Sequence, residues 1–154
     1  PPLPLRRLGD RDWVALLRLA EAATPIDVQR VRPLRPEALR PTLLKRLQSW
    51  LDAFFTGRQT WRWGLDQDSD LAAVISIMAQ DNTSPVRLDL AVRPAIRGSV
   101  EGALADFGLA TVSALRPRSV AANVSTSHPE ALHALQERQF YTLRTLDQLV
   151  LQLD

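Results

Sequence analysis

The chain has 154 residues, 45% of them hydrophobic and 23% charged, a composition typical of a globular domain and not of a disordered chain. It contains no cysteine, which excludes disulfides, thiol catalysis and cysteine-bound zinc and fits a cytoplasmic location. The net charge is +2, the arginines are spread along the chain and no apolar run is long, so we expect neither nucleic-acid nor membrane binding. We expect residues 1–154 to form a single domain; because the first residue is not Met, this domain can be part of a longer protein.

Two helices are predicted in the first third of the chain. Asp10 is a good N-cap, and Trp13, Leu16, Leu17 and Ala20 follow at the spacing of one buried helical face. Residues 24–41 contain four prolines, too many for a continuous helix. A second helix is predicted from Pro41 to Phe55, with Gly57 as its stop.

Three strands are predicted next, over 60–65, 71–79 and 86–92, with Leu88, Leu90 and Val92 on one face of the third. Asp66, Asp68 and Asp70 imitate the start of a calcium loop. However, Leu71 stands where such a loop needs glycine, so a polar hairpin turn is predicted and no metal.

The last third alternates between helices and strands. We predict a helix over 99–115, a strand over 119–124, a short helix over 128–138 and two strands within 140–153. The strand pair 86–92 and 119–124, joined by a helix, must be parallel.

Two motifs surround the helix over 99–115. Val92, Arg93 and Pro94 close the strand before it, and RGSVEG, residues 97–102, opens it. With the order of elements, these motifs resemble the GNAT superfamily of acyl-CoA-dependent N-acyltransferases over nearly the whole chain. The family has Val-x-Pro at the first place and Gln/Arg-x-x-Gly-x-Gly/Ala at the second. The resemblance implies an α+β fold with α/β/α layers, in which helices flank a mixed, mostly antiparallel sheet with one parallel βαβ unit.

The same resemblance implies a co-substrate, acetyl-CoA or another acyl-CoA, whose pantetheine arm lies between strands four and five. Its pyrophosphate would lie at the helix N-terminus, where free amides attract anions. Val100 and Glu101 depart from the family pattern, since one is β-branched and the other brings a negative charge unless it points away. Alternatively, Ser99 only caps the helix and Glu101 complements its dipole. The implied cofactor-binding residues are Leu90, Ala91, Val92, Arg97, Gly98, Ser99, Val100, Glu101, Gly102 and Ala103.

The catalytic candidates are one base and one acid. Asp89, on the predicted strand 86–92, which corresponds to the family's fourth strand, is the candidate base for the attacking amine, or else part of a solvated polar face. The family often has a tyrosine as proton donor where this chain has Leu135, and Tyr141 is the candidate acid in its stead. His128 is expected as a helix cap or surface residue and His133 as half-buried, not as metal ligands.

Two functions of different class therefore follow from the sequence. One is an N-acetyltransferase-like protein that passes an acyl group from acyl-CoA to an amine of a small molecule or protein by direct attack. The alternative is a degenerate, non-catalytic domain of the same fold that binds a partner or ligand. A homodimer or a partner domain stays open in both cases.

Overall fold

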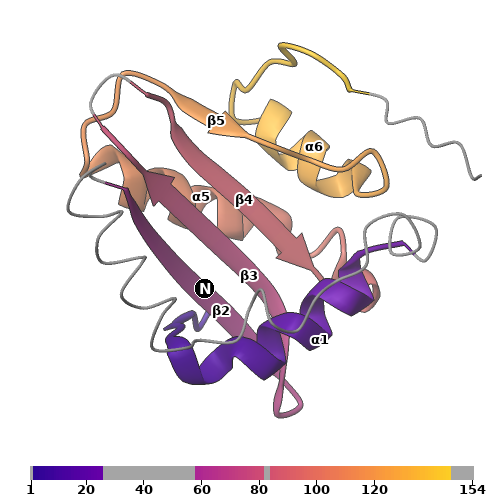
Figure 1. Ribbon diagram of the computed structural model, residues 1–154. Coiled ribbons are helices and arrows are strands. Elements are labelled where there is room, and N and C mark those ends of the chain that lie inside the picture. The colour runs from indigo at the N-terminus through magenta and orange to yellow at the C-terminus, as the bar shows by residue number, and fades with distance from the viewer. Residues whose placement is uncertain (1, 26–57, 82–83, 147–154) are drawn as a thin grey trace, which may run out of the picture.

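The computed structural model describes residues 2–25, 58–81 and 84–146. In that part of the chain, five strands form one sheet in the order β1-β2-β3-β4-β5 (Figure 1). The strands are β1 Arg6–Arg7, β2 Gln59–Gln67, β3 Asp70–Ala79, β4 Val86–Val92 and β5 Val120–Ala122. The helices are α1 Trp13–Ala23, α5 Glu101–Ser113 and α6 Pro129–Gln136, with 3-10 turns η1 at Asp10–Asp12 and η2 at Pro94–Ile96.

The sheet is mixed, as predicted. Neighbouring strands from β1 to β4 are antiparallel, and β4 pairs with β5 in parallel through the crossover helix α5. The turn between β2 and β3 places Asp68 and Ser69 in the left-handed region, at φ 51° and 65°. This conformation is that of a tight hairpin turn, which confirms the predicted polar turn.

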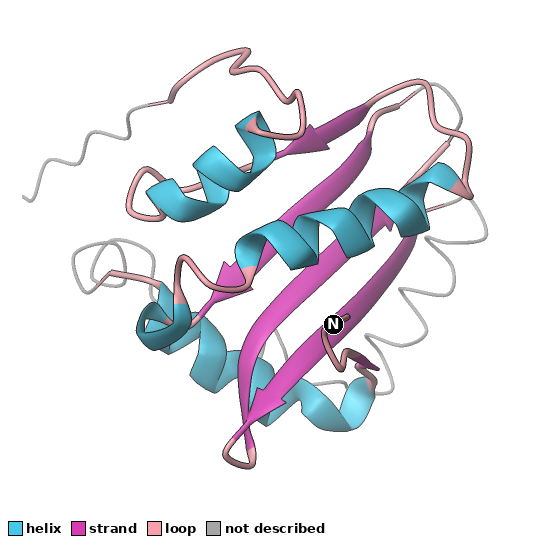
Figure 2. Cartoon of the chain, turned by 180° about the vertical axis from the view of Figure 1, so that it is seen from behind, coloured by secondary structure: helices cyan, strands magenta, loops and turns pink. Residues whose placement is uncertain are grey.

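Helices cover both faces of the sheet. α1 lies across one face, over β3 and β4, while α5 crosses the opposite face, with α6 beside it (Figures 1 and 2). The result is the predicted α/β/α layering, with apolar side chains packed on both sides of the sheet.

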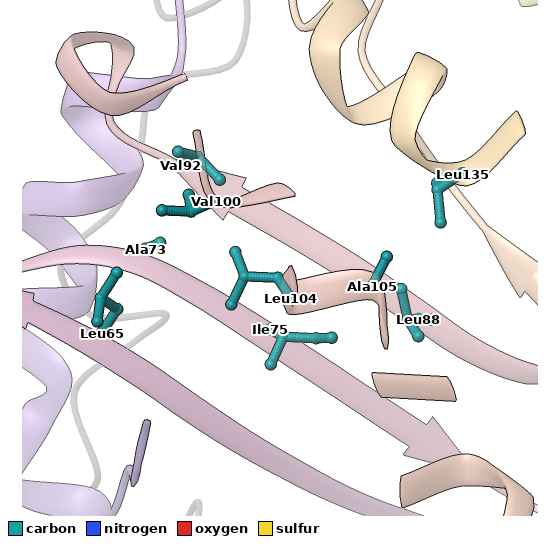
Figure 3. Close-up of a cluster of buried hydrophobic side chains, with 9 residues drawn as sticks. All are labelled: Leu65, Ala73, Ile75, Leu88, Val92, Val100, Leu104, Ala105 and Leu135. Atoms are coloured by element: carbon teal, nitrogen blue, oxygen red, sulfur yellow. The ribbon is translucent and has the colours of Figure 1, made fainter. Parts of the chain in front are cut away.

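The larger cluster lies between the sheet and α5. β3, β4, α5 and α6 all contribute to it, and its fully buried members include Ile75, Leu88 and Leu104 (Figure 3). α5 comes close to the sheet at Gly108, where an added Cβ would lie 2.4 Å from Ile75 Cδ1 and 2.6 Å from Leu88 Cδ1. On the α1 side, Leu19, Leu71 and Val74 form a smaller cluster.

Several predicted elements need correction. α5 begins at Glu101 instead of Ser99, because a 3-10 turn and a loop precede it. Residues 140–146 alternate apolar and polar as a strand would, but they have no strand partner and form no strand. Tyr141 and Leu143 there are 79% and 81% exposed. The predicted helix from 41 to 55 and the end of the predicted C-terminal strands lie outside the described residues.

Candidate acyl-thioester site

The site begins where β4 and β5 separate. Their ladder runs from Val86–Val120 to Leu88–Ala122 and then stops. The backbone N–H of Asn123 donates to the Asp89 carboxylate at that point. Beyond the ladder, β4 continues to Val92, and among the described strands it has a neighbour there only on its β3 side.

The backbone groups of Leu90 and Val92 face this separation. The Arg93 N–H bonds to Ala72 O on β3, while the Val86 N–H bonds to Ser119 O just before β5. Because successive residues of a strand direct their amides to opposite neighbours, Leu90 and Val92 share the β5 side with Val86. The end of β4 therefore presents a short row of peptide groups to the space where β5 would have continued.

A cavity of about 230 Å³ occupies that space. Its walls come from the end of β4, from the segment between β5 and α6, and from the last turn of α1. The residues that matter below are Ala23, Leu90, Ala91, Val92, Val124 and His128. We call this cavity the β4–β5 groove.

One end of the groove adjoins the loop between η2 and α5. Gly98 takes the left-handed φ of 84° that glycine adopts without strain, and the Ser99 hydroxyl donates to Ile96 O at 2.6 Å. The Gly98 and Val100 N–H groups point inward and donate to one carboxylate oxygen, Glu101 Oε2, at 2.8 and 3.3 Å. The loop thus binds an anion, and that anion belongs to the chain itself.

Glu101 is buried together with a histidine. Its side chain is 2% exposed, and Oε1 lies 2.8 Å from Nε2 of His128, which is 8% exposed. His128 is the residue before α6, so this pair joins the N-terminus of α5 to that of α6. Both oxygens of the carboxylate therefore have partners, as a buried charge requires.

No family model matches the sequence, and no curated protein matches it. Solved structures do match. A predicted acetyltransferase with acetyl-CoA from Clostridium acetobutylicum has a TM-score of 0.61 at 11% identity, over 95% of this chain and 94% of that one. An aminoglycoside 6′-N-acetyltransferase from Acinetobacter haemolyticus has a TM-score of 0.59 at 11% identity, over 99% of this chain and 100% of that one. A transcriptional regulator from Bacillus halodurans has a TM-score of 0.61 at 12% identity, over 97% of this chain and 99% of that one. This chain has the GNAT fold.

The surroundings of Glu101 and of the two histidines differ in part from those predicted from the sequence. In the sequence, a glutamate in the first turn of a helix is typical of a solvated dipole partner, so Glu101 was expected either to point away or to complement the dipole. His128 was expected as a cap or surface residue, and His133 as half-buried. His128 does occupy the N-cap position of α6, as predicted, but it is buried against Glu101 and not at the surface. The expectation for His133 was wrong, because its side chain is 74% exposed beside Glu137. The two partners are 27 residues apart, so no local periodicity connects them.

The Val100 side chain points into the core and not toward the surface of the loop, where the GNAT motif would leave room for a pyrophosphate. Its side chain is 8% exposed and packs with the core, near Val92 and Leu104 (Figure 3). Its β-branch therefore does not obstruct the surface of the loop. Gly102 follows in α5, where an added Cβ would lie 3.1 Å from an Arg138 guanidinium nitrogen, and Ala103 is exposed.

Arg97, the first residue of the motif, holds the walls of the groove together. Its guanidinium donates to Ser127 O and Ala23 O, both at 3.1 Å, and to Val92 O at 3.4 Å. These carbonyls belong to the segment before α6, the last residue of α1 and the end of β4. The arginine thus sets the separation of three elements that line the site.

The two predicted catalytic residues lie in different surroundings. Asp89 is partly buried on the α1 face of β4, and burial raises the pKa of its carboxyl above the ordinary value, against the smaller opposing effects of Arg87 and the Asn123 N–H. A raised pKa suits a group that takes a proton near neutral pH. Tyr141 is 79% exposed and follows α6 in an irregular segment, away from the residues that line the groove.

The described residues show neither a cluster of metal ligands nor a helix that could cross a membrane. Within 2–25, 58–81 and 84–146, no three His, Cys, Asp or Glu side chains gather as metal ligands would. Over the same ranges, none of the helices has both the length and the apolar character that a membrane crossing requires.

Proposed function

We propose that this protein is an N-acyltransferase that takes an acyl group, acetyl in the first instance, from a CoA thioester and passes it to an amine. The observation that carries the proposal is the separation of β4 and β5 after Leu88, which leaves a groove beside the peptide groups of Leu90 and Val92. An amide-containing chain such as pantetheine can pair with such a strand edge as an added strand does. The GNAT neighbour solved with acetyl-CoA supports acyl-CoA as the donor.

The proposed reaction is a direct attack. The nitrogen of the acceptor amine attacks the thioester carbonyl carbon, and the carbonyl oxygen becomes an oxyanion that the Val92 N–H stabilises. Asp89, directly or through water, takes the proton that the nitrogen loses. The carbon–sulfur bond then breaks, and the thiolate takes a proton from water, since Tyr141, the donor predicted from the sequence, is not among the residues that line the groove. The products are an amide and a free thiol, without a covalent enzyme intermediate.

The acceptor is proposed to approach from the α1 side of the sheet. Residues alternate along β4, so Asp89 shares its face with Ala91, which packs against the α1-side cluster. The base and the thioester arm then lie on adjoining sides of β4. The proposal leaves the acceptor open, so the amine can belong to a small molecule or to a protein. A cytoplasmic location and a homodimer or partner domain stay predictions.

A second candidate function is a non-catalytic GNAT-fold domain that binds a partner or ligand. The Glu101 carboxylate favours it, since it takes the loop amides that the resemblance assigns to a pyrophosphate. The two functions differ in one measurable property, the breaking of a thioester.

The test is release of free thiol from acetyl-CoA and from acetyl-pantetheine, in the presence of a panel of amines and protein N-termini. The proposal expects amine-dependent thiol release by the wild-type chain and its loss in Asp89→Asn. Saturable binding of both thioesters without thiol release for any amine would support the non-catalytic domain instead.

A further inference from the structure

We infer that Glu101 takes the place of the donor's pyrophosphate, so that this site recognises a thioester by its pantetheine arm and not by its nucleotide. The inference rests on the proposed function and refines its donor specificity. It makes Glu101 a specificity-determining residue, with His128 as the residue that positions it.

The loop amides are the first reason. Amides at a helix N-terminus attract anions, and two of those here, the N–H groups of Gly98 and Val100, already donate to Glu101 Oε2. To bind these two amides, a pyrophosphate oxygen would have to replace that carboxylate. Displacing it would leave a buried charge without its two donors and His128 without its partner, both of which are unfavourable.

Charge is the second reason. Besides Glu101, Glu130 of α6 lies at this loop, since an added Cβ at Gly98 would be 3.9 Å from Glu130 Cγ. Oε2 of Glu130 is buried and accepts no hydrogen bond from the described part of the chain. A pyrophosphate at this loop would meet two carboxylates of its own sign. The N–H groups of Arg97 are directed to three backbone carbonyls and not to an anion at this loop.

The groove has the apolar walls and the backbone groups that an extended pantetheine arm needs. Its walls are mainly apolar, and Leu90 and Val92 offer peptide groups along one side. Its volume of about 230 Å³ is below the roughly 300–1,000 Å³ of pockets that enclose drug-sized ligands. Such a space suits an extended chain, with any nucleotide left outside in solvent.

The experiment compares the binding of CoA and of pantetheine, measured by calorimetry, to the wild-type chain and to three variants. In Glu101→Ala the loop amides are free and the charge is gone. Glu101→Gln keeps an acceptor and the size of the side chain but removes the charge. Glu137→Gln is the matched control, since it removes one negative charge from an exposed position just after α6.

For the wild-type chain, we expect CoA and pantetheine to bind with dissociation constants within about threefold of each other. Both Glu101 variants should tighten CoA by about tenfold or more, with pantetheine unchanged, while Glu137→Gln should resemble the wild type. Tighter binding of CoA than of pantetheine by more than about tenfold to the wild type would overturn the inference, even if the variants failed to fold. An unchanged ratio in folded Glu101 variants would overturn it as well.

If no variant binds either thiol, the proposed function fails, and inorganic pyrophosphate then tests the inference alone. The Gly98 and Val100 amide resonances of Glu101→Ala should shift with pyrophosphate, whereas those of the wild type should not. Equal shifts in both proteins, or none in either, would refute the role of Glu101.

Discussion

Replacing Asp89 by Asn should separate activity from stability. The carboxyl is partly buried, and burial raises its pKa, which means that the folded chain disfavours the charged form. Asn has nearly the same shape and still offers an oxygen to the Asn123 N–H. The variant therefore loses the proton acceptor but keeps the hydrogen bond.

The sign of the effect on stability follows from linkage. A carboxyl whose pKa is higher in the folded than in the unfolded chain binds more protons when folded, so its contribution becomes less favourable as pH rises through that interval. Near neutral pH the ionised Asp89 opposes folding, and Asp89→Asn should melt at the same temperature as the wild type or higher. At about pH 4 that advantage should shrink, because a larger share of Asp89 is protonated there than at neutral pH. General-base catalysis contributes about 10²–10⁴-fold, so we expect the rate of acyl transfer to fall by that factor.

Asp106→Asn is the matched control. The Arg138 guanidinium donates to Asp106 at 2.6 and 2.8 Å and lowers the pKa of that carboxyl, and the pair lies at the surface, away from the groove. Loss of this ion pair should lower the free energy of unfolding by at most about 1 kcal/mol and leave the rate of acyl transfer unchanged. The assays are the rate of thiol release and thermal melts at the two pH values. A fall in rate of less than about tenfold in Asp89→Asn, or a lower melting temperature than that of Asp106→Asn, would refute the reasoning.

Two further predictions concern the framework of the site. In urea denaturation, the free energy of unfolding of Gly108→Ala should be lower than that of Gly102→Ala by about 1–3 kcal/mol. The methyl group at 108 would lie 2.4 Å from Ile75, whereas that at 102 meets only the flexible guanidinium of Arg138. Equal urea midpoints for the two variants would contradict this. Hydrogen bonds from arginines lower the pKa of Asp12 and Asp70, so the stability they contribute should be lost as pH falls through those lowered values. The doubly substituted Asn variant should show a shallower acid slope in denaturation, and an unchanged slope would argue against these pairs.

The order of elements could be predicted from the sequence because it depends on local patterns. The alternation of Leu88, Leu90 and Val92 and the helical spacing after Ser99 required a parallel strand pair, and the structure has it. The same alternation at 140–146 was misleading. A strand forms only where a neighbouring backbone pairs with it, and the described part of β5 pairs with β4 alone over three residues.

The chemistry of the loop could be predicted only in part. Gly98 and Ser99 indicated a helix N-terminus, and Glu101 was recognised as a negative charge in the wrong place. Its burial depends on His128, whose position is set by the way α6 packs on α5, and that is a tertiary contact without a local signal. Likewise, no pattern indicated that Arg97 would bind three carbonyls from separate elements.

The central claim is that the groove beside the end of β4 receives the arm of a thioester. Two-dimensional amide spectra of the wild-type chain, recorded while pantetheine is added, test it most directly. The resonances of Leu90 and Val92 should shift saturably, while that of exposed Arg62 on β2 should stay in place. If pantetheine at saturating concentration leaves both β4 amides unmoved, the groove is not a thioester site and the proposed transfer chemistry has no donor.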